Sequence, residues 1–263
     1  MTDTKVAVVT GASSGNGRAI ALRLARDGYS VVCSDLREQP RAGGYDDSPE
    51  VPTHELIQNE GGAATFVAAD TSNFEQMSGV VETAVGVYGR LDVFVNNAGV
   101  FFGLGNIVEE TEEVFDKTIG VNLKGVWNGS KLAITQFLKQ EPRDGTRGVV
   151  VNIASIGGLV GLPEEPAYCA SKGGVVNLSR QLAVDFAEHR IRVNTICPGF
   201  LETAMAREFL DDPTLNAGLH AQSPWPNLGT AEDVAKAVSF LAGDQSSWVT
   251  GANLVVDGGF TIR

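Results

Sequence analysis

The sequence predicts an α/β fold, in which a parallel, doubly wound sheet carries helices on both faces. Short apolar, β-branched segments alternate with longer segments of helical periodicity along the chain of 263 residues. The short segments are nearly continuous in apolar residues, which is typical of strands that are buried on both faces. The chain shows no internal repeat and no shift in composition, so we expect a single domain over residues 1–263.

Seven strands and five long helices are expected. The first apolar segment, Val6–Thr10, is followed by a helix over Arg18–Asp27, whose apolar residues recur at helical spacing. The further strands are predicted over Tyr29–Asp35, Thr65–Ala69, Leu91–Asn96, Val149–Ile153, Arg192–Ile196 and Leu254–Val256. The further helices are predicted over Phe74–Tyr88, Thr111–Leu138, Ala167–His189 and Ala231–Ala242. Thr230 and Asp233 have the spacing of a capping box at the start of the last helix.

Two segments depart from this alternation. Residues 38–52 are rich in Pro, Gly and Asp, which predicts a loop insert. Residues 201–227 follow the sixth strand and are expected to be partly helical, at a place where a lid over a substrate could lie.

Composition and charge exclude several classes of partner. The net charge is −12, which disfavours binding to a nucleic-acid backbone. No apolar run approaches the roughly 20 residues that span a bilayer, and the N-terminus lacks the pattern of a signal peptide. Three well-separated cysteines without a C-x-x-C pair, and three histidines without ligand spacing, predict no metal site and a reducing, cytoplasmic location.

A glycine-rich turn follows the first strand and opens the first helix. Its residues are Thr10-Gly11-Ala12-Ser13-Ser14-Gly15-Asn16-Gly17. Glycines let the backbone pass close to a pyrophosphate, and the helix N-terminus supplies amide donors and positive potential. Since both the strand and the helix flank this turn, the sequence predicts a nucleotide site.

Asp35, at the end of the second predicted strand, is the residue expected to discriminate between NAD and NADP. Asp35 can accept hydrogen bonds from the adenosine ribose hydroxyls, and its charge would repel a 2′-phosphate, so NAD is favoured over NADP. Arg18 and Arg37 lie close enough in sequence for either to meet a phosphate, which leaves NADP as the alternative.

Tyr168 and Lys172 are four residues apart in a predicted helix, with Ser155 upstream. This spacing places the phenol and the ammonium group on one helix face. A neighbouring cation favours the phenolate, so Tyr168 is a candidate proton donor and acceptor.

Five ordered motifs resemble the short-chain dehydrogenase/reductase family over nearly the whole chain. The turn Thr10–Gly17 matches its T-G-x-x-x-G-x-G motif, except that Asn16 stands where the family usually has Ile or Leu. The other matches are Asn96-Asn97-Ala98-Gly99, the catalytic set Asn122, Ser155, Tyr168 and Lys172, the adenine-contacting Asp70, and Pro198-Gly199 with Thr203. The resemblance implies a Rossmann-type fold.

The resemblance also implies roles for these residues. Tyr168 would be the acid and base, Ser155 would position the reacting oxygen, and Lys172 would hold the nicotinamide ribose and lower the Tyr168 pKa. Asn122 would support a water that connects Lys172 to solvent. The residues expected to bind the cofactor are Gly11, Ser13, Ser14, Gly15, Asn16, Gly17, Asp35, Asp70, Thr71, Asn97, Ala98, Gly99, Tyr168, Lys172, Pro198, Gly199 and Thr203. The residues expected to contact the substrate are Ser155, Ile156, Gly157, Leu162, Glu164, Tyr168 and Leu201.

These expectations point to an NAD(H)-dependent oxidoreductase that interconverts a secondary alcohol and a ketone. Two alternatives stay open: a 3-oxoacyl-carrier-protein reductase, and a non-catalytic regulator that senses dinucleotides. The family resemblance further implies a homotetramer, whose helical interface would use the segments 111–138 and 167–189.

Overall fold

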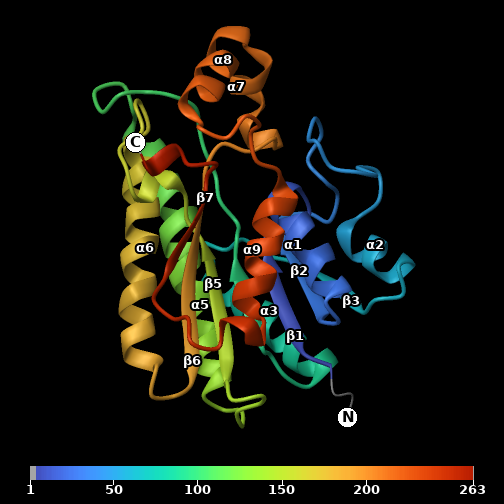
Figure 1. Cartoon of the computed structure of the whole chain (residues 1–263). Coiled ribbons are helices and arrows are strands. Elements are labelled where there is room, and N and C mark those ends of the chain that lie inside the picture. The colour runs from blue at the N-terminus through green and yellow to red at the C-terminus, as the bar shows by residue number, and fades with distance from the viewer. Residues whose placement is uncertain (1–3, 263) are drawn as a thin grey trace.

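The computed structural model, which describes residues 4–262, has one seven-stranded parallel sheet in the order β3-β2-β1-β4-β5-β6-β7 (Figure 1). This confirms the predicted doubly wound, Rossmann-type fold. The strands are β1 (Val6–Thr10), β2 (Ser30–Asp35), β3 (Ala64–Ala68), β4 (Val93–Asn96), β5 (Gly148–Ile153), β6 (Ile191–Pro198) and β7 (Asn253–Val256). Every neighbouring pair is parallel, so all the strands present their carboxyl ends at one edge of the sheet.

Helices cover both faces of this sheet, as the sequence predicts (Figure 1). One core packs α1, α2 and α9 on the first face, and the other packs α3, α5 and α6 on the second. The α-helices are α1 (Gly15–Arg26), α2 (Thr53–Asn59), α3 (Phe74–Tyr88), α4 (Glu112–Ile119), α5 (Gly125–Phe137), α6 (Pro166–Phe186), α7 (Arg207–Asp211), α8 (Pro213–Gln222) and α9 (Ala231–Ala242). Short helical turns are η1 (Gly120–Lys124), η2 (Ile156–Gly158), η3 (Ala204–Ala206), η4 (Asp244–Ser246) and η5 (Phe260–Ile262).

The alternation of side chains along β1 explains the two cores. Ala7 and Val9 belong to the first, whereas Val6 and Val8 belong to the second. Successive side chains of a strand point to opposite faces, so one fully buried apolar strand contributes to both cores.

One predicted helix differs from the structure, and one short helix, α2, was not predicted. The single helix expected over 111–138 is interrupted by a π-helical turn, η1, between α4 and α5. The segment 38–52 is a loop as expected, and the short helix α2 follows it. The partly helical character expected for 201–227 is confirmed, since this segment contains η3, α7 and α8. Figure 1 shows α7 and α8 beyond the carboxyl edge of the sheet.

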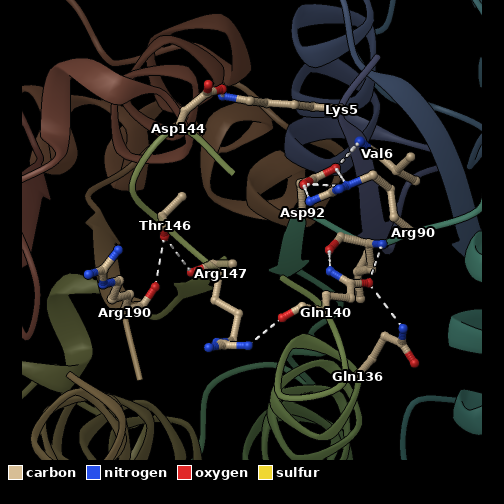
Figure 2. A network of polar contacts seen from close by, with 12 residues as sticks. Lys5, Val6, Arg90, Asp92, Gln136, Gln140, Asp144, Thr146, Arg147 and Arg190 are labelled. Carbon is tan, nitrogen blue, oxygen red and sulfur yellow. Dashed lines mark hydrogen bonds and ion pairs between the residues drawn. The ribbon is translucent and has the colours of Figure 1, made fainter. Parts of the chain in front are cut away.

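A polar network fixes the opposite edge, where β1 and β4 begin (Figure 2). Asp92 accepts a hydrogen bond from the Val6 backbone amide at 2.8 Å and pairs with Arg90 at 2.6 Å. The Lys5 ammonium group pairs with Asp144 at 2.9 Å. The side-chain amide of Gln140 holds the chain just before β4 through hydrogen bonds of 2.9 and 2.6 Å to the Leu91 backbone. The strands are thus anchored at the edge where no predicted site residue lies.

The buried guanidinium group of Arg18 anchors the insert 38–52 to α1. Arg18 is only 2% exposed. It donates hydrogen bonds to the backbone carbonyls of Val51 at 2.8 Å, Asp47 at 3.0 Å and Ser48 at 2.8 Å. Burial lowers the pKa of Arg18, and the nearby Asp46, Glu50 and Asp47 carboxylates oppose that shift. Arg18 is therefore committed to the insert, which argues against the expectation that it could meet a phosphate.

We expect Arg18→Met to lower the free energy of unfolding by about 2–4 kcal/mol, because it leaves three carbonyls without their donor. Chemical denaturation followed by circular dichroism measures the change. Arg26→Met is the control, since Arg26 on the same helix pairs with Glu60 at an exposed position and such pairs contribute at most about 1 kcal/mol. Equal stability of the two variants would contradict the anchoring role of Arg18.

Candidate functional site

A cavity of about 650 Å³ opens at the carboxyl edge of the sheet. Residues that follow β1, β2, β4, β5 and β6 line it. The strand order reverses between β1 and β4, and such a reversal leaves a crevice in which α/β proteins bind ligands. The volume is typical of a site for a small molecule or cofactor.

The glycine turn after β1 is closed by contacts that only glycine permits. Gly11 has φ +64°, and a Cβ on it would lie 2.9 Å from the Ala98 Cα. A Cβ on Gly17 would lie 1.9 Å from the Gly11 carbonyl oxygen. The Thr10 hydroxyl accepts hydrogen bonds from the backbone amides of Asn97 at 3.0 Å and Ala98 at 3.1 Å. The turns after β1 and β4 therefore form one rigid wall.

This wall fits a nicotinamide dinucleotide. Gly11, Gly15 and Asn16 line the cavity at the start of α1, where backbone amides and the helix dipole favour phosphate groups. Within residues 4–262, the buried Asn16 Oδ1 atom has no hydrogen-bond partner. Asp35 also lines the cavity, and its carboxylate accepts a hydrogen bond from the Ser13 amide at 3.1 Å. Asp35 and the first residues of α1 thus border the space that a dinucleotide would fill.

The insert 38–52 contacts this turn directly. The Asp46 carboxylate accepts a hydrogen bond from the Gly15 amide at 2.9 Å, and burial raises the Asp46 pKa. From the 201–227 segment, the Arg207 guanidinium group donates to the Gly43 carbonyl and lies over the Tyr45 ring. The insert therefore connects the turn with the segment beyond β6.

Ser155, Tyr168 and Lys172 lie together in the same cavity. Ser155 follows β5, and its hydroxyl accepts a hydrogen bond from the Gly157 amide at 3.1 Å. A hydrogen bond also joins the Ser155 and Tyr168 side chains. Tyr168 and Lys172 are one turn apart on α6, and the Lys172 Nζ lies 5.7 Å from the centroid of the Tyr168 ring.

Burial is the main cause of the pKa shifts of Tyr168 and Lys172. It raises the Tyr168 pKa to about 12, although the hydrogen bond from Ser155 opposes the shift. Burial also lowers the Lys172 pKa to about 8, and its Nζ donates to the Ile153 carbonyl at 3.0 Å. The expected lowering of the Tyr168 pKa is therefore not seen in the protein alone. In this state Tyr168 is protonated at neutral pH and can act as a proton donor.

Asn122 does not line the cavity with Ser155, Tyr168 and Lys172. It is fully buried in the π-helical turn η1 and does not line the cavity. Its Oδ1 accepts from the Val100 amide at 2.8 Å, and its Nδ2 donates to the Val100 carbonyl at 3.0 Å. The side chain therefore fixes the segment after β4, and the expected role of Asn122 toward a water next to Lys172 stays a prediction.

Most of the predicted site residues line the cavity. They are Gly11, Ser13, Ser14, Gly15, Asn16, Asp35, Asp70, Thr71, Asn97, Ala98, Gly99, Ser155, Ile156, Leu162, Tyr168, Lys172, Pro198, Gly199, Leu201 and Thr203. Besides Asn122, three do not line it. Gly17 packs against the Gly11 carbonyl, Gly157 supports the Ser155 hydroxyl, and Glu164 is exposed, with φ +61°.

Glu164, expected as a substrate contact, does not line the cavity, whereas the adjacent Glu165 does. Glu165 is 8% exposed, and burial raises its pKa to about 7. The sequence could not separate the two adjacent carboxylates. The choice depends on the backbone, whose left-handed conformation at Glu164 precedes the first residue of α6, Pro166.

The free energy of unfolding should depend on pH through Glu165. Between pH 4.5 and 7 the folded state holds this proton while the unfolded state loses it, so rising pH destabilises the protein. From pH 4.5 to 8, we expect wild type to lose about 2–3 kcal/mol relative to Glu165→Gln. Denaturant titrations at several pH values measure this difference, with Glu164→Gln as the control. Parallel pH profiles of wild type and Glu165→Gln would contradict the assignment.

Residues 4–262 contain neither a cluster that could hold a metal ion nor a helix that could span a membrane. No cluster of three His, Cys, Asp or Glu side chains in this range is arranged to hold a metal ion. No helix in this range is both long enough and apolar enough to span a membrane.

Comparisons with known proteins identify the family. The model of a family described as enoyl-(acyl carrier protein) reductase matches residues 11–261. The 2-(R)-hydroxypropyl-CoM dehydrogenase of Xanthobacter autotrophicus is 37% identical, over 98% of this chain and 99% of its own. The 3beta-hydroxysteroid dehydrogenase 1 of Eggerthella lenta is also 37% identical, over 98% of this chain and 94% of its own.

A solved structure agrees with these matches. The putative 2-deoxy-D-gluconate 3-dehydrogenase of Agrobacterium tumefaciens, with bound NADP, superposes with a TM-score of 0.85 at 32% identity. The alignment covers 98% of this chain and 97% of that one. With the glycine turn and the Ser155–Tyr168–Lys172 group in one cavity, the chain belongs to the short-chain dehydrogenase/reductase family of oxidoreductases.

Proposed function

We propose that the protein interconverts a secondary alcohol and a ketone with NAD(H) as its cofactor. The observation that carries this proposal is the position of Ser155, Tyr168 and Lys172 in the same cavity as the glycine turn. The turn supplies a place for the dinucleotide, and the polar group supplies proton transfer next to it. The relatives named as dehydrogenases support the same class of reaction.

The side chains divide the chemistry between them. In ketone reduction, the Tyr168 hydroxyl donates its proton to the carbonyl oxygen, and in alcohol oxidation the tyrosinate takes the hydroxyl proton. The Ser155 hydroxyl hydrogen-bonds the same oxygen and stabilises its developing charge. A bound nicotinamide would supply the hydride chemistry at the reacting carbon. Lys172 would bind the nicotinamide ribose and, while charged, favour the tyrosinate.

The preference for NAD rests on Asp35. Its carboxylate lines the cavity at the end of β2, where it would accept hydrogen bonds from the adenosine ribose and repel a 2′-phosphate. The commitment of Arg18 to the insert supports this preference. Arg37 and Arg41 also line the cavity, and the Agrobacterium relative holds NADP, so NADP is the competitor to measure.

The 201–227 segment is proposed as the lid over the substrate. Phe209 from α7 packs on Phe101 at 5.9 Å between ring centroids, and Phe101 contacts the Tyr168 ring edge-on at 5.6 Å. Leu201 lines the cavity beside them. These aromatic contacts connect the segment to the reacting group, and a small-molecule substrate would lie beneath it.

Association and location stay predictions. A homotetramer would cover apolar side chains that are exposed on α5 and α6, such as Trp127 and Val184, which are 44% and 79% exposed. Trp248, at 99% exposure, would belong to a second interface. The three free cysteines, Cys33, Cys169 and Cys197, support a reducing cytoplasm.

A spectrophotometric screen tests the function. Purified protein is assayed for NADH formation and consumption with secondary alcohols, diols, sugars and ketones, and the assay is repeated with NADP(H). Turnover of an alcohol with NAD supports the proposal. Binding of NADH without any turnover would instead support a dinucleotide-sensing regulator. Turnover of a 3-oxoacyl thioester alone would support the carrier-protein reductase. A Thermotoga maritima relative of that name, 35% identical, favours this alternative, and the net charge of −12 does not.

A further inference from the structure

A buried acidic side chain in the cavity, Glu165, has no partner among the side chains that the structure describes. Glu165 lines the cavity and is 8% exposed. Among the side chains that the structure describes, none donates a hydrogen bond to its carboxylate or pairs with it, and burial alone raises its pKa. Although Glu165 is the N-cap residue of α6, its side chain does not cap that helix. A buried, unpaired carboxylate is unfavourable unless a donor pairs with it. The missing donor is therefore expected from the molecule that fills the cavity.

Glu165 faces the reacting group. It is the N-cap residue of α6, three residues before Tyr168, and both residues line the cavity. Burial is the main cause of the raised Tyr168 pKa, and the charge on Glu165 adds to it, so the two groups interact. The other carboxylate nearby, Glu110, accepts a hydrogen bond from the Ala167 amide at 3.4 Å. Glu165 is thus the carboxylate that is available to a substrate held at Tyr168.

The remaining wall around the substrate end is apolar. Phe101, Ile156, Leu162 and Phe209 line it. An alcohol whose other groups are all apolar would pack against these side chains, but it would offer Glu165 no hydrogen-bond donor. A substrate with a second hydroxyl would satisfy both, since a site built around a buried polar group rejects analogues that lack its partner.

We propose that Glu165 is the specificity-determining residue of this cavity and accepts a hydrogen bond from a second hydroxyl, close to the carbon that is oxidised. The inference rests on the proposed function and names its substrate class: diols, polyols and the corresponding hydroxyketones.

A hydroxyl fits the site better than an ammonium group. The Lys172 ammonium group lines the same cavity and would repel a second cation. A hydroxyl can pair with a carboxyl group in either protonation state, and with a pKa of about 7 Glu165 populates both states near neutral pH. An ammonium group gains the charge interaction only from the ionised state.

The test compares cyclohexanol with trans-1,2-cyclohexanediol as substrates with NAD. In wild type, kcat/KM should favour the diol. In Glu165→Leu, the diol-to-alcohol ratio should fall by about 10- to 100-fold, the effect of losing one hydrogen bond to a charged group. Glu165→Gln keeps an acceptor and should recover part of the ratio. Glu164→Leu is the matched control, because Glu164 does not line the cavity, and it should keep the wild-type ratio.

Binding separates this inference from the proposed function. The thermal shift produced by the diol is measured on the NADH complexes of wild type and Glu165→Leu, because a ligand raises stability according to its affinity. If wild type oxidises none of the alcohols, the proposed function fails, but a diol shift that Glu165→Leu lacks still supports the subsite. An unchanged ratio in Glu165→Leu, a diol shift of equal size in both proteins, or a preference for 2-aminocyclohexanol over the diol would overturn the proposal.

Discussion

Replacing Tyr168 by phenylalanine is expected to lower kcat by about 10³-fold or more, since general acid–base catalysis by a positioned side chain contributes roughly 10²- to 10⁴-fold. The ring would remain against Phe101, so the cavity keeps its shape. Affinity for NADH should therefore change little. Steady-state assays with the best substrate of the screen, together with fluorescence titration of NADH, measure the two effects separately.

Tyr88→Phe is the matched control for this experiment. Tyr88 is the last residue of α3 and does not line the cavity, so its hydroxyl should be dispensable for turnover. If Tyr168→Phe kept wild-type kcat, another group would have to exchange the proton, and the central assignment would be wrong. If it lost NADH binding as well, the phenol would be acting in cofactor binding.

Removing the charge of Asp35 should shift the cofactor preference. In Asp35→Asn, we expect the ratio of kcat/KM for NAD over that for NADP to fall by about 10- to 100-fold, because hydrogen bonds to a charged group are lost and repulsion of a 2′-phosphate ends. Asparagine keeps an acceptor for the Ser13 amide, which bonds the carboxylate at 3.1 Å, so the turn should stay intact. The ratio is measured with one alcohol and both cofactors.

Asp47→Asn controls for the general loss of one negative charge. Asp47 lies on the exposed insert and does not line the cavity. Its variant should keep the wild-type cofactor ratio. An unchanged ratio in Asp35→Asn would remove Asp35 as the selector and direct attention to Arg37 and Arg41, which line the same part of the cavity.

The sequence predicts some parts of the candidate site better than others. Motifs with a fixed spacing on one element, such as the glycine turn or Tyr168 and Lys172, predict geometry, because a strand, a turn and a helix have regular repeats. Glu164 and Glu165 show the limit. Both are acidic and adjacent, and a single left-handed residue decides which one lies in the cavity.

Asn122 shows a second limit. Its place in the chain matched the expected set, and the structure adds that its amide group bonds the backbone amide and carbonyl of Val100 and that Asn122 does not line the cavity. A π-helical turn carries it, and helical periodicity alone predicted a continuous helix there. One extra residue per turn rotates every later side chain, and such bulges recur at functional sites without a strong sequence signal.

By itself, the sequence determined the alternation of strands and helices, the parallel sheet, and the edge where the turn and the Tyr168–Lys172 pair would meet. These follow from local periodicity and from the rule that parallel strands end together. Only the tertiary structure decided which polar groups are paired. Arg18 donates hydrogen bonds to the insert 38–52, and Asn122 bonds the backbone of Val100. Glu165 has no partner among the side chains that the structure describes. Pairing and burial depend on neighbours far apart in the chain, and no local pattern encodes them.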